Sequence, residues 1–147
     1  MAYAFIVLAE SLEQKQVGRT ETKVPSVVEL RHQARELLKR AIQIKPNYLN
    51  ARLFLAILSY DEGNYPNALQ EVNNALSIEA THPTALRRKG FILEKLGESD
   101  EALEVLDQAK QRLQDTQKNG ENEHWIQEVD EKVAELKKRK SKRPKKN

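Results

Sequence analysis

A repeat of 34 residues is the feature that most constrains what this chain can fold into. Several series of small residues recur at that interval, in register with one another. They are Ala34, Ala68 and Ala102; Ala41, Ala75 and Ala109; Ala51 and Ala85; and Gly63 and Gly97. Leu69 and Leu103 keep the same offset. A period of about 20–50 residues predicts stacked units, each of which buries its apolar face against its neighbours.

Helix-end signals divide the repeats into helices. Ser26 and Glu29 have the spacing of a capping box. Pro66 and Pro83 each suit the first turn of a helix. Thr81 is the candidate N-cap of the helix that contains Pro83. The two repeated glycines are expected to form tight turns with positive φ. The predicted helices lie near residues 2–16, 26–44, 48–62, 65–79, 83–96, 99–118 and 122–141.

These spacings resemble the tetratricopeptide repeat (TPR) family, in which each repeat is a pair of helices, A and then B. The family's small residues at repeat positions 8, 20 and 27 correspond to Ala56, Ala68, Ala75 and, one repeat later, Gly90, Ala102 and Ala109. Arg52 and Leu86 stand where the family often has Trp, and Ser59 where it often has Tyr. The resemblance implies an all-α fold, a right-handed α-solenoid of about three helix pairs plus a C-terminal capping helix.

The predicted organisation is a single domain over residues 1–136. It would contain an atypical first repeat (1–48), two repeats (49–82 and 83–116) and a capping helix (122–141), followed by a basic tail (137–147). The capping helix carries an apolar stripe of Trp125 or Ile126, then Val129, Val133 and Leu136. Such a stripe suits the open end of a stack, and we expect Trp125 to pack there.

The net charge of +3 is the sum of a negatively charged body and a positively charged C-terminal tail. The tail contributes eight of the 25 Lys and Arg residues, which leaves 17 against 22 Asp and Glu, or −5, in residues 1–136. The tail cations are Lys137, Lys138, Arg139, Lys140, Lys142, Arg143, Lys145 and Lys146. Such a run of cations either forms a solvated chain end or binds an anionic partner. That partner would be nucleic acid, a ribosome or an anionic membrane surface.

The sequence lacks the residues that several kinds of catalytic or metal site require. The sequence has no Cys, its three His have no metal-ligand spacing, and no glycine-rich phosphate loop is present. We therefore expect no catalysis, metal, cofactor or small-molecule substrate. The apolar run Met1–Ala9 is shorter than the ~20 residues of a membrane span. It is expected to be part of an amphipathic helix, an anchor or a self-association surface, in a cytoplasmic protein (or a nuclear one in a eukaryote).

The resemblance also implies a binding surface, because the A helices of this family line a concave groove. The corresponding residues are Asn50, Leu53, Phe54, Ile57, Tyr60, Arg87, Arg88 and Phe91. They would bind a peptide or helix of a partner protein, and the two arginines would select an acidic segment. Alternatively, the apolar members pack against the N-terminal or C-terminal helix.

The function predicted from these features is that of a protein–protein interaction adaptor or scaffold. One alternative is a nucleic-acid- or ribosome-associated protein that acts through its tail, and another is a small secretion or assembly chaperone. Family members that bind EEVD tails clamp a carboxylate with Lys and Asn. Phe54 and Thr84 stand at those positions and only Arg88 matches, so binding of EEVD tails is not expected.

Overall fold

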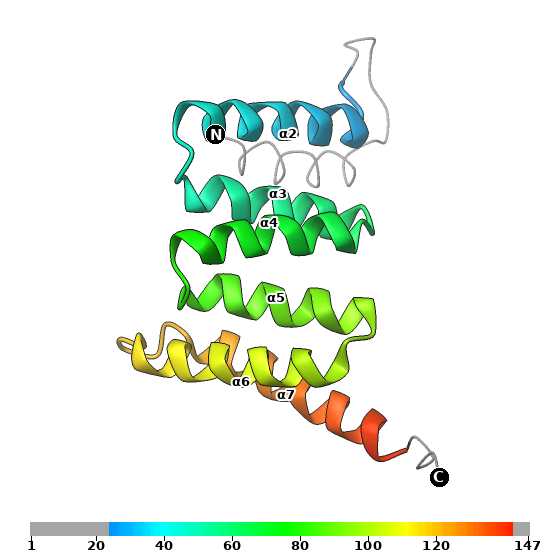
Figure 1. Ribbon diagram of the computed structural model, residues 1–147, viewed down its shortest axis with the longest axis vertical. Helices are drawn as coiled ribbons and strands as arrows, with labels where there is room; N and C mark the ends of the chain where they lie inside the picture. Colours follow the sequence, from blue (N-terminus) through cyan, green and yellow to red (C-terminus); the bar gives the residue numbers. More distant parts are fainter. Residues whose placement is uncertain (1–23, 143–147) are drawn as a thin grey trace.

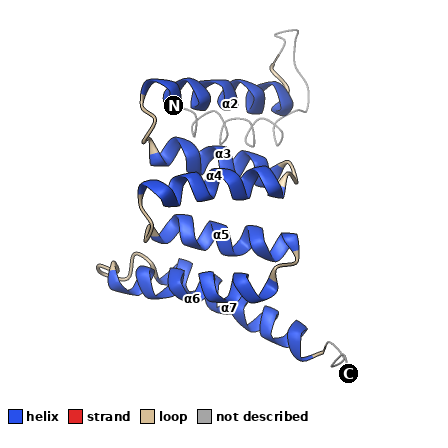
Figure 2. Ribbon diagram, viewed as in Figure 1, coloured by secondary structure: helices blue, strands red, loops and turns tan. Residues whose placement is uncertain are grey.

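The computed structural model describes residues 24–142, which form an all-α stack. Its helices are α2 (Val27–Ile44), α3 (Leu49–Asp61), α4 (Tyr65–Ile78), α5 (Pro83–Leu96), α6 (Ser99–Asp115) and α7 (Glu123–Ser141). Only helices and connecting loops occur in this part of the chain (Figure 2). Each of the six lies where the sequence predicted a helix. The helix predicted at residues 2–16 falls outside the described residues.

Short turns return the chain so that successive helices lie side by side, from α2 through α6 (Figure 1). The helix α7 packs on α6 and then leaves the stack at an angle, with its C-terminal end pointing away. Three clusters of buried side chains follow one another along the stack, between α2 and α3, among α3, α4 and α5, and among α5, α6 and α7. The predicted TPR-type solenoid is therefore confirmed.

The repeated small residues lie where helices cross. Ala34, Ala68 and Ala102 are each fully buried, with 0% of their surface exposed. Alanine at these points lets two helix backbones approach closely, which a larger side chain would prevent. The small residues that recur every 34 residues in the sequence are thus the residues at which the helices contact one another.

The ends of the helices follow local rules, with two departures. Ser26 and Glu29 form the predicted capping box. The cap of α5 is His82, whose Nδ1 accepts a hydrogen bond from the backbone N–H of Ala85 at 3.3 Å. The prediction of Thr81 was wrong, because Pro83 begins the helix and so places the cap one residue later. The helix α6 ends at Asp115, three residues before the predicted end, and Gly120 adopts positive φ (80°) in the following turn.

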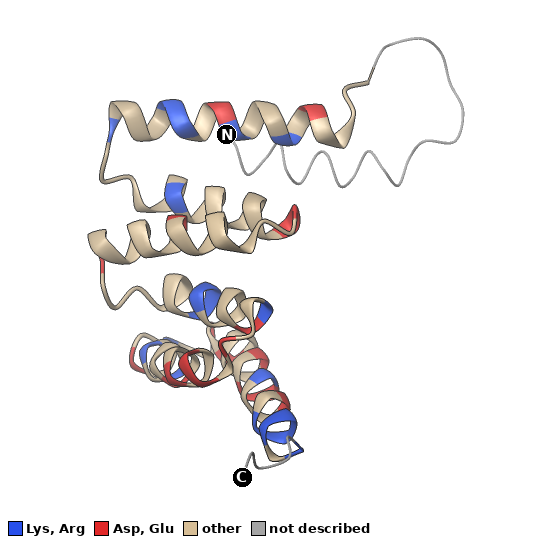
Figure 3. Ribbon diagram, turned by 45° about the vertical axis from the view of Figure 1, so that its right-hand side comes forward, with Lys and Arg blue, Asp and Glu red and all other residues tan. Residues whose placement is uncertain are grey.

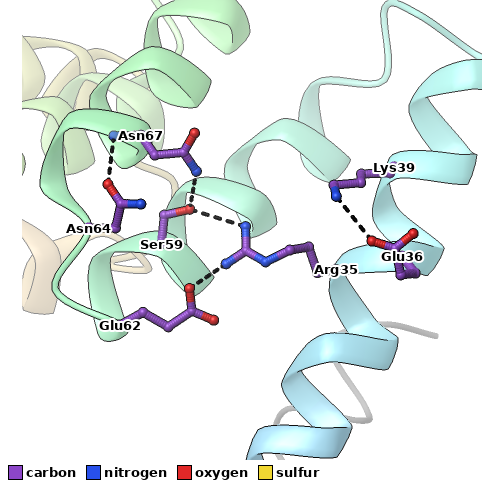
Figure 4. A network of polar contacts seen from close by, with 7 residues as sticks. All are labelled: Arg35, Glu36, Lys39, Ser59, Glu62, Asn64 and Asn67. Atoms are coloured by element: carbon purple, nitrogen blue, oxygen red, sulfur yellow. Dashed lines mark hydrogen bonds and ion pairs between the residues drawn. The ribbon is translucent and has the colours of Figure 1, made fainter.

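A buried polar network joins the first three described helices (Figure 4). The Ser59 hydroxyl is fully buried and accepts hydrogen bonds from Asn67 Nδ2 at 2.7 Å and Arg35 Nη1 at 3.4 Å. Arg35 Nη2 also contacts the Glu62 carboxylate at 2.6 Å. One small hydroxyl residue, where the family often has tyrosine, therefore connects side chains from α2 and α4 through α3.

We predict that Ser59→Ala lowers the free energy of unfolding by about 1–3 kcal/mol, because the partly buried donors on Asn67 and Arg35 lose their acceptor. Urea denaturation followed by circular dichroism measures the change. Ser77→Ala is the matched control, since Ser77 is exposed and bonds only to the Asn74 carbonyl of its own helix. Equal effects of the two substitutions would contradict a structural role for the network.

Gly90 lies at a close contact between α5 and α6. A Cβ atom built on Gly90 would lie 2.5 Å from both Cγ and Cδ2 of Leu106, and Leu106 is itself fully buried in α6. At this distance the Leu106 side chain or one of the two helices has to shift. The absence of a side chain at Gly90 is therefore a packing requirement of the α5–α6 contact.

We predict that Gly90→Ala destabilises the protein, although alanine favours helices. Overpacking costs about 1–3 kcal/mol, whereas the gain in helix propensity is about 1 kcal/mol. In the double variant with Leu106→Ala, the space for the new methyl group is restored. Urea denaturation should therefore give a double variant more stable than the sum of the single effects, and strict additivity would refute the clash.

Charge is distributed unevenly along the stack. The helix α4 carries one charged residue, Glu71, and α3 carries only Arg52 and Asp61, whereas charges crowd the C-terminal helices (Figure 3). Within residues 24–142, no helix combines the length and apolarity required to cross a bilayer. Among the described helices, charge is therefore sparse in α3 and α4 and denser in α2 and in α5, α6 and α7.

Candidate functional site

A cavity of about 270 Å³ opens between α3, α5 and α7. We call it the α3/α5/α7 cavity, and its lining residues are Ala56, Ile57, Tyr60, Arg88, Phe91, Ile92, Glu94, Lys95, Glu128 and Lys132. Two predicted A helices form two of its walls, and the capping helix forms the third. Its lining combines apolar side chains with three cations and two carboxylates.

Four of the residues predicted for the groove line this cavity: Ile57 and Tyr60 on α3, and Arg88 and Phe91 on α5. They meet because each pair is separated by three residues, which places both side chains on one face of its helix. Tyr60 also packs edge-on against Tyr65 of α4, with ring centroids 5.3 Å apart. Burial, followed by the nearby Glu94 carboxylate, raises the pKa of Tyr60, so its hydroxyl stays protonated.

The other four predicted residues lie elsewhere. Asn50 is exposed near the start of α3, outside the cavity lining. Phe54 is partly buried and packs against the α2–α3 cluster. Leu53 and Arg87 are buried, with 6% and 3% of their surfaces exposed. Neither residue lines the cavity, which is lined by four of the eight residues predicted for the groove.

Arg87 is the clearest of these differences, because it was expected to face a partner. Its guanidinium pairs instead with the Glu128 carboxylate of α7 and lies 4.0 Å from the centroid of the Trp125 ring. Burial lowers the pKa of Arg87, while Glu128 acts in the opposite direction. Trp125 remains 38% exposed, and Ile126 takes the buried position of the apolar stripe. The packing role of Trp125 is therefore to cover a buried cation.

Polar contacts continue along the same side of α7. Glu94 of α5 is nearly buried, with 5% side-chain exposure, and it lies 3.7 Å from Lys132 Nζ and 2.9 Å from Arg139 Nη1. We call these contacts the α5/α7 seam, formed by Arg87, Phe91 and Glu94 of α5 with Trp125, Glu128, Lys132 and Arg139 of α7. Although burial alone would lower the pKa of Lys132, its hydrogen bond to Glu135 and the attraction of Glu94 raise it.

The sequence analysis left open that the apolar groove residues pack against the C-terminal helix, but it did not assign Glu128 and Lys132 of α7 to the cavity. The signal was present, since Trp125, Glu128, Lys132, Glu135 and Arg139 follow one another at intervals of three and four residues. This polar stripe runs beside the apolar stripe that the analysis did find. Only the packing of α7 against α5 shows that Glu128 and Lys132 reach the cavity.

The basic segment is partly incorporated into the fold. The helix α7 continues to Ser141. Arg139 contacts Glu94 of α5, and Lys140 Nζ contacts the Asp100 carboxylate of α6 at 2.6 Å. The side chains of Lys137, Lys138 and Lys142 are exposed, whereas Arg143, Lys145 and Lys146 lie outside the described residues. Two of the cations expected to bind an anionic partner therefore already pair with carboxylates of the body.

No group of three or more His, Cys, Asp or Glu side chains with the arrangement of a metal site occurs among residues 24–142. The carboxylates at the cavity, Glu94 and Glu128, lie against cations instead. The chemistry available in the cavity is therefore ion pairing, hydrogen bonding and apolar contact.

We predict that Glu128→Gln destabilises the protein by leaving Arg87 buried without its counter-charge. Breaking a fully buried pair costs about 3–5 kcal/mol, and the partial exposure of Glu128 reduces our expectation to about 1–2 kcal/mol. The single tryptophan, which lies on Arg87, reports the unfolding by its fluorescence in urea. Glu131→Gln removes the same charge from an exposed position of α7 and should change stability by less than about 0.5 kcal/mol.

The geometry defines an α-helical repeat protein with a hollow on one face of its stack. The tetratricopeptide repeat family model matches residues 31–73 and 59–119, which together span more than half of the chain. The protein therefore belongs to the tetratricopeptide repeat family. A comparison with curated proteins found no match.

Solved structures agree on the fold. The type III secretion translocator chaperone SycD of Yersinia enterocolitica is similar with a TM-score of 0.70 at 15% identity, over 95% of this chain and 85% of that one. The TPR2B domain of yeast Sti1, solved in a complex named for pHsp70, has a TM-score of 0.64 at 18% identity. The match covers 91% of this chain and 96% of that one. The TPR domain of Sgt2 from Aspergillus fumigatus has a TM-score of 0.61 at 12% identity. The match covers 99% of this chain and 87% of that one.

Proposed function

We propose that this protein is a non-catalytic interaction module that binds a peptide segment of a partner protein in the α3/α5/α7 cavity. The observation that carries the proposal is the cavity itself, where half-buried Ile57, Tyr60 and Phe91 lie beside charged side chains. Apolar side chains left partly open beside polar groups are typical of a docking surface.

The size of the cavity is compatible with one or two side chains of a peptide. Its volume of about 270 Å³ lies below the range of about 300–1,000 Å³ that is usual for small-molecule sites. A space of this size holds one or two side chains of a longer segment whose remainder lies along the surface. The Sti1 and Sgt2 domains share the fold, and a TPR domain of Spaghetti was solved bound to an HSP90 peptide. Peptide binding therefore requires no new architecture.

The proposal is limited to a partner segment of this kind. It does not extend to EEVD tails, because Phe54 and Thr84 stand at two of the clamp positions. The likeness to SycD is one of fold, as is the likeness to the Sti1 domain, so assignment as a secretion chaperone has no separate support. Attachment through the tail is less favoured, since Arg139 and Lys140 pair with Glu94 and Asp100 of the body.

Selection from a phage-displayed peptide library tests the proposal, with the full chain as bait. We expect recovered peptides to bind at least about tenfold more weakly to Phe91→Ala, which corresponds to about 1.4 kcal/mol of binding free energy. Val28→Ala, which shortens a 75% exposed side chain on α2, should leave binding unchanged. Circular dichroism checks that both variants fold. Peptides that bind the two variants equally, or the absence of any selected peptide, would count against the cavity as the site.

A further inference from the structure

The turn between α6 and α7 contains the single Asn-Gly pair of the sequence, Asn119 and Gly120 (Figure 1). Both residues have positive φ, at 53° and 80°, and the backbone N–H of Glu121 donates a hydrogen bond to the Lys118 carbonyl at 3.1 Å. Positive φ at both central residues, with a hydrogen bond between the two ends, is the pattern of a type I′ turn. Such turns favour Asn followed by Gly. The local sequence therefore determines the conformation of this turn.

The turn leaves the backbone nitrogen of Gly120 free to react with the Asn119 side chain. Within residues 24–142, neither the Gly120 N–H nor the Asn119 amide group takes part in a hydrogen bond. Both residues are exposed. Apart from its two chain neighbours, no residue has an atom within 4 Å of the place where a Cβ of Gly120 would lie. The side-chain carbonyl carbon of Asn119 is therefore open both to the neighbouring nitrogen and to water.

The other asparagines in the turns between the described helices lack at least one of these conditions. Asn47 is followed by a backbone N–H that already donates to a main-chain carbonyl, at 3.0 Å. The side chain of Asn64 caps α4, and that of Asn122 donates to a main-chain carbonyl at 2.9 Å. Each of the three is also followed by a residue with a side chain, which hinders attack by the nitrogen of that residue. Asn119 thus differs from them in hydrogen bonding as well as in sequence.

From this geometry we propose that Asn119 is a site of spontaneous covalent modification, in which the Gly120 nitrogen closes a succinimide ring on the Asn119 side chain. A bond forms between the Gly120 nitrogen and Cγ of Asn119, and the bond between Cγ and Nδ2 breaks. Nδ2 leaves as ammonia with the proton that the Gly120 nitrogen gives up. Water then opens the ring at either carbonyl, which gives aspartate or isoaspartate. The reaction consumes one water and releases one ammonia, and it does not depend on the proposed binding of a peptide.

The two products change the turn in different ways. Aspartate leaves the main chain as it is and adds a negative charge beside Lys118. Isoaspartate carries the main chain through Cβ of residue 119, so it adds one atom between the Lys118 carbonyl and the Glu121 N–H. The hydrogen bond that closes the turn is therefore expected to persist in the aspartyl form and to be lost in the isoaspartyl form.

Incubation of the full chain in neutral buffer at physiological temperature tests the site. The chain is then digested at mildly acidic pH, which suppresses further reaction, and its peptides are compared with an unincubated sample by mass spectrometry. Synthetic aspartyl and isoaspartyl standards identify the two products by their retention. We expect Asn119 to react at least about tenfold faster than Asn47, Asn64 or Asn122, which corresponds to about 1.4 kcal/mol in barrier height. A smaller difference would overturn the inference.

A synthetic peptide of residues 116–122 with blocked ends gives the rate of the same Asn-Gly pair without the fold. Because the turn leaves the Gly120 nitrogen free, we expect the folded chain to react at a rate within about tenfold of the peptide, or about 1.4 kcal/mol in barrier height. A folded chain that reacts more slowly than this would show that the turn protects Asn119, and would overturn the inference from the opposite side. Circular dichroism confirms that the chain remains folded during the incubation.

Asn119→Asp should remove the modified peptide and leave the chain folded, because it reproduces one of the two products. Asn47→Asp is the matched control, since it makes the same change in another exposed turn, and modification of Asn119 should continue in it. The isoaspartyl form, isolated by ion exchange, is compared with Asn119→Asp by the temperature dependence of the Glu121 amide proton shift. We expect a steeper dependence in the isoaspartyl form, and equal dependences would contradict the loss of the turn hydrogen bond.

Discussion

The close approach of helices at small residues is the constraint on which the rest of this structure depends. Ala34, Ala68 and Ala102 are fully buried at successive crossings, and Gly90 leaves no space for even a methyl group beside Leu106. Once the backbones lie this close, the larger apolar residues on the same faces are buried without further requirement. The cavity follows from the same constraint, because α3 and α5 are held at a fixed separation by the helix α4 packed between them.

The fold could be predicted from the sequence because its determinants are local and repeated. A period of 34 residues, a capping box at Ser26 and glycines in the turns all act within a few residues of the chain or recur in register. The polar site could not be predicted to the same extent, because its contacts join residues far apart. Arg87 was assigned to the groove by its repeat position, yet Glu128, 41 residues later, draws it into the α5/α7 seam. The polar stripe of α7 contains Glu128, but its spacing does not show which residue of α5 it contacts.

The capping helix has two tasks that its two stripes keep separate. The apolar stripe, which includes Val129 and Leu136, closes the last hydrophobic cluster of the stack. The polar stripe beside it contacts α5 through ion pairs and places Glu128 and Lys132 at the cavity. An end helix that only shielded the core would need the first stripe alone. The polar stripe makes the end of the solenoid part of the candidate binding surface. It also places the start of the basic segment in contact with the body, through Arg139 and Glu94.

The charge distribution indicates that the unpaired state of Arg88 is specific to its position. Residues 1–136 contain 22 acidic and 17 basic residues, so carboxylates are not scarce in the body of the protein. The preceding and following residues on α5, Arg87 and Lys89, each have a carboxylate partner, in Glu128 and Glu101. Arg88 lies between them and has no carboxylate partner within residues 24–142, although its Nε is removed from water. A buried polar atom without a hydrogen bond lowers stability, and this atom belongs to a residue that lines the α3/α5/α7 cavity.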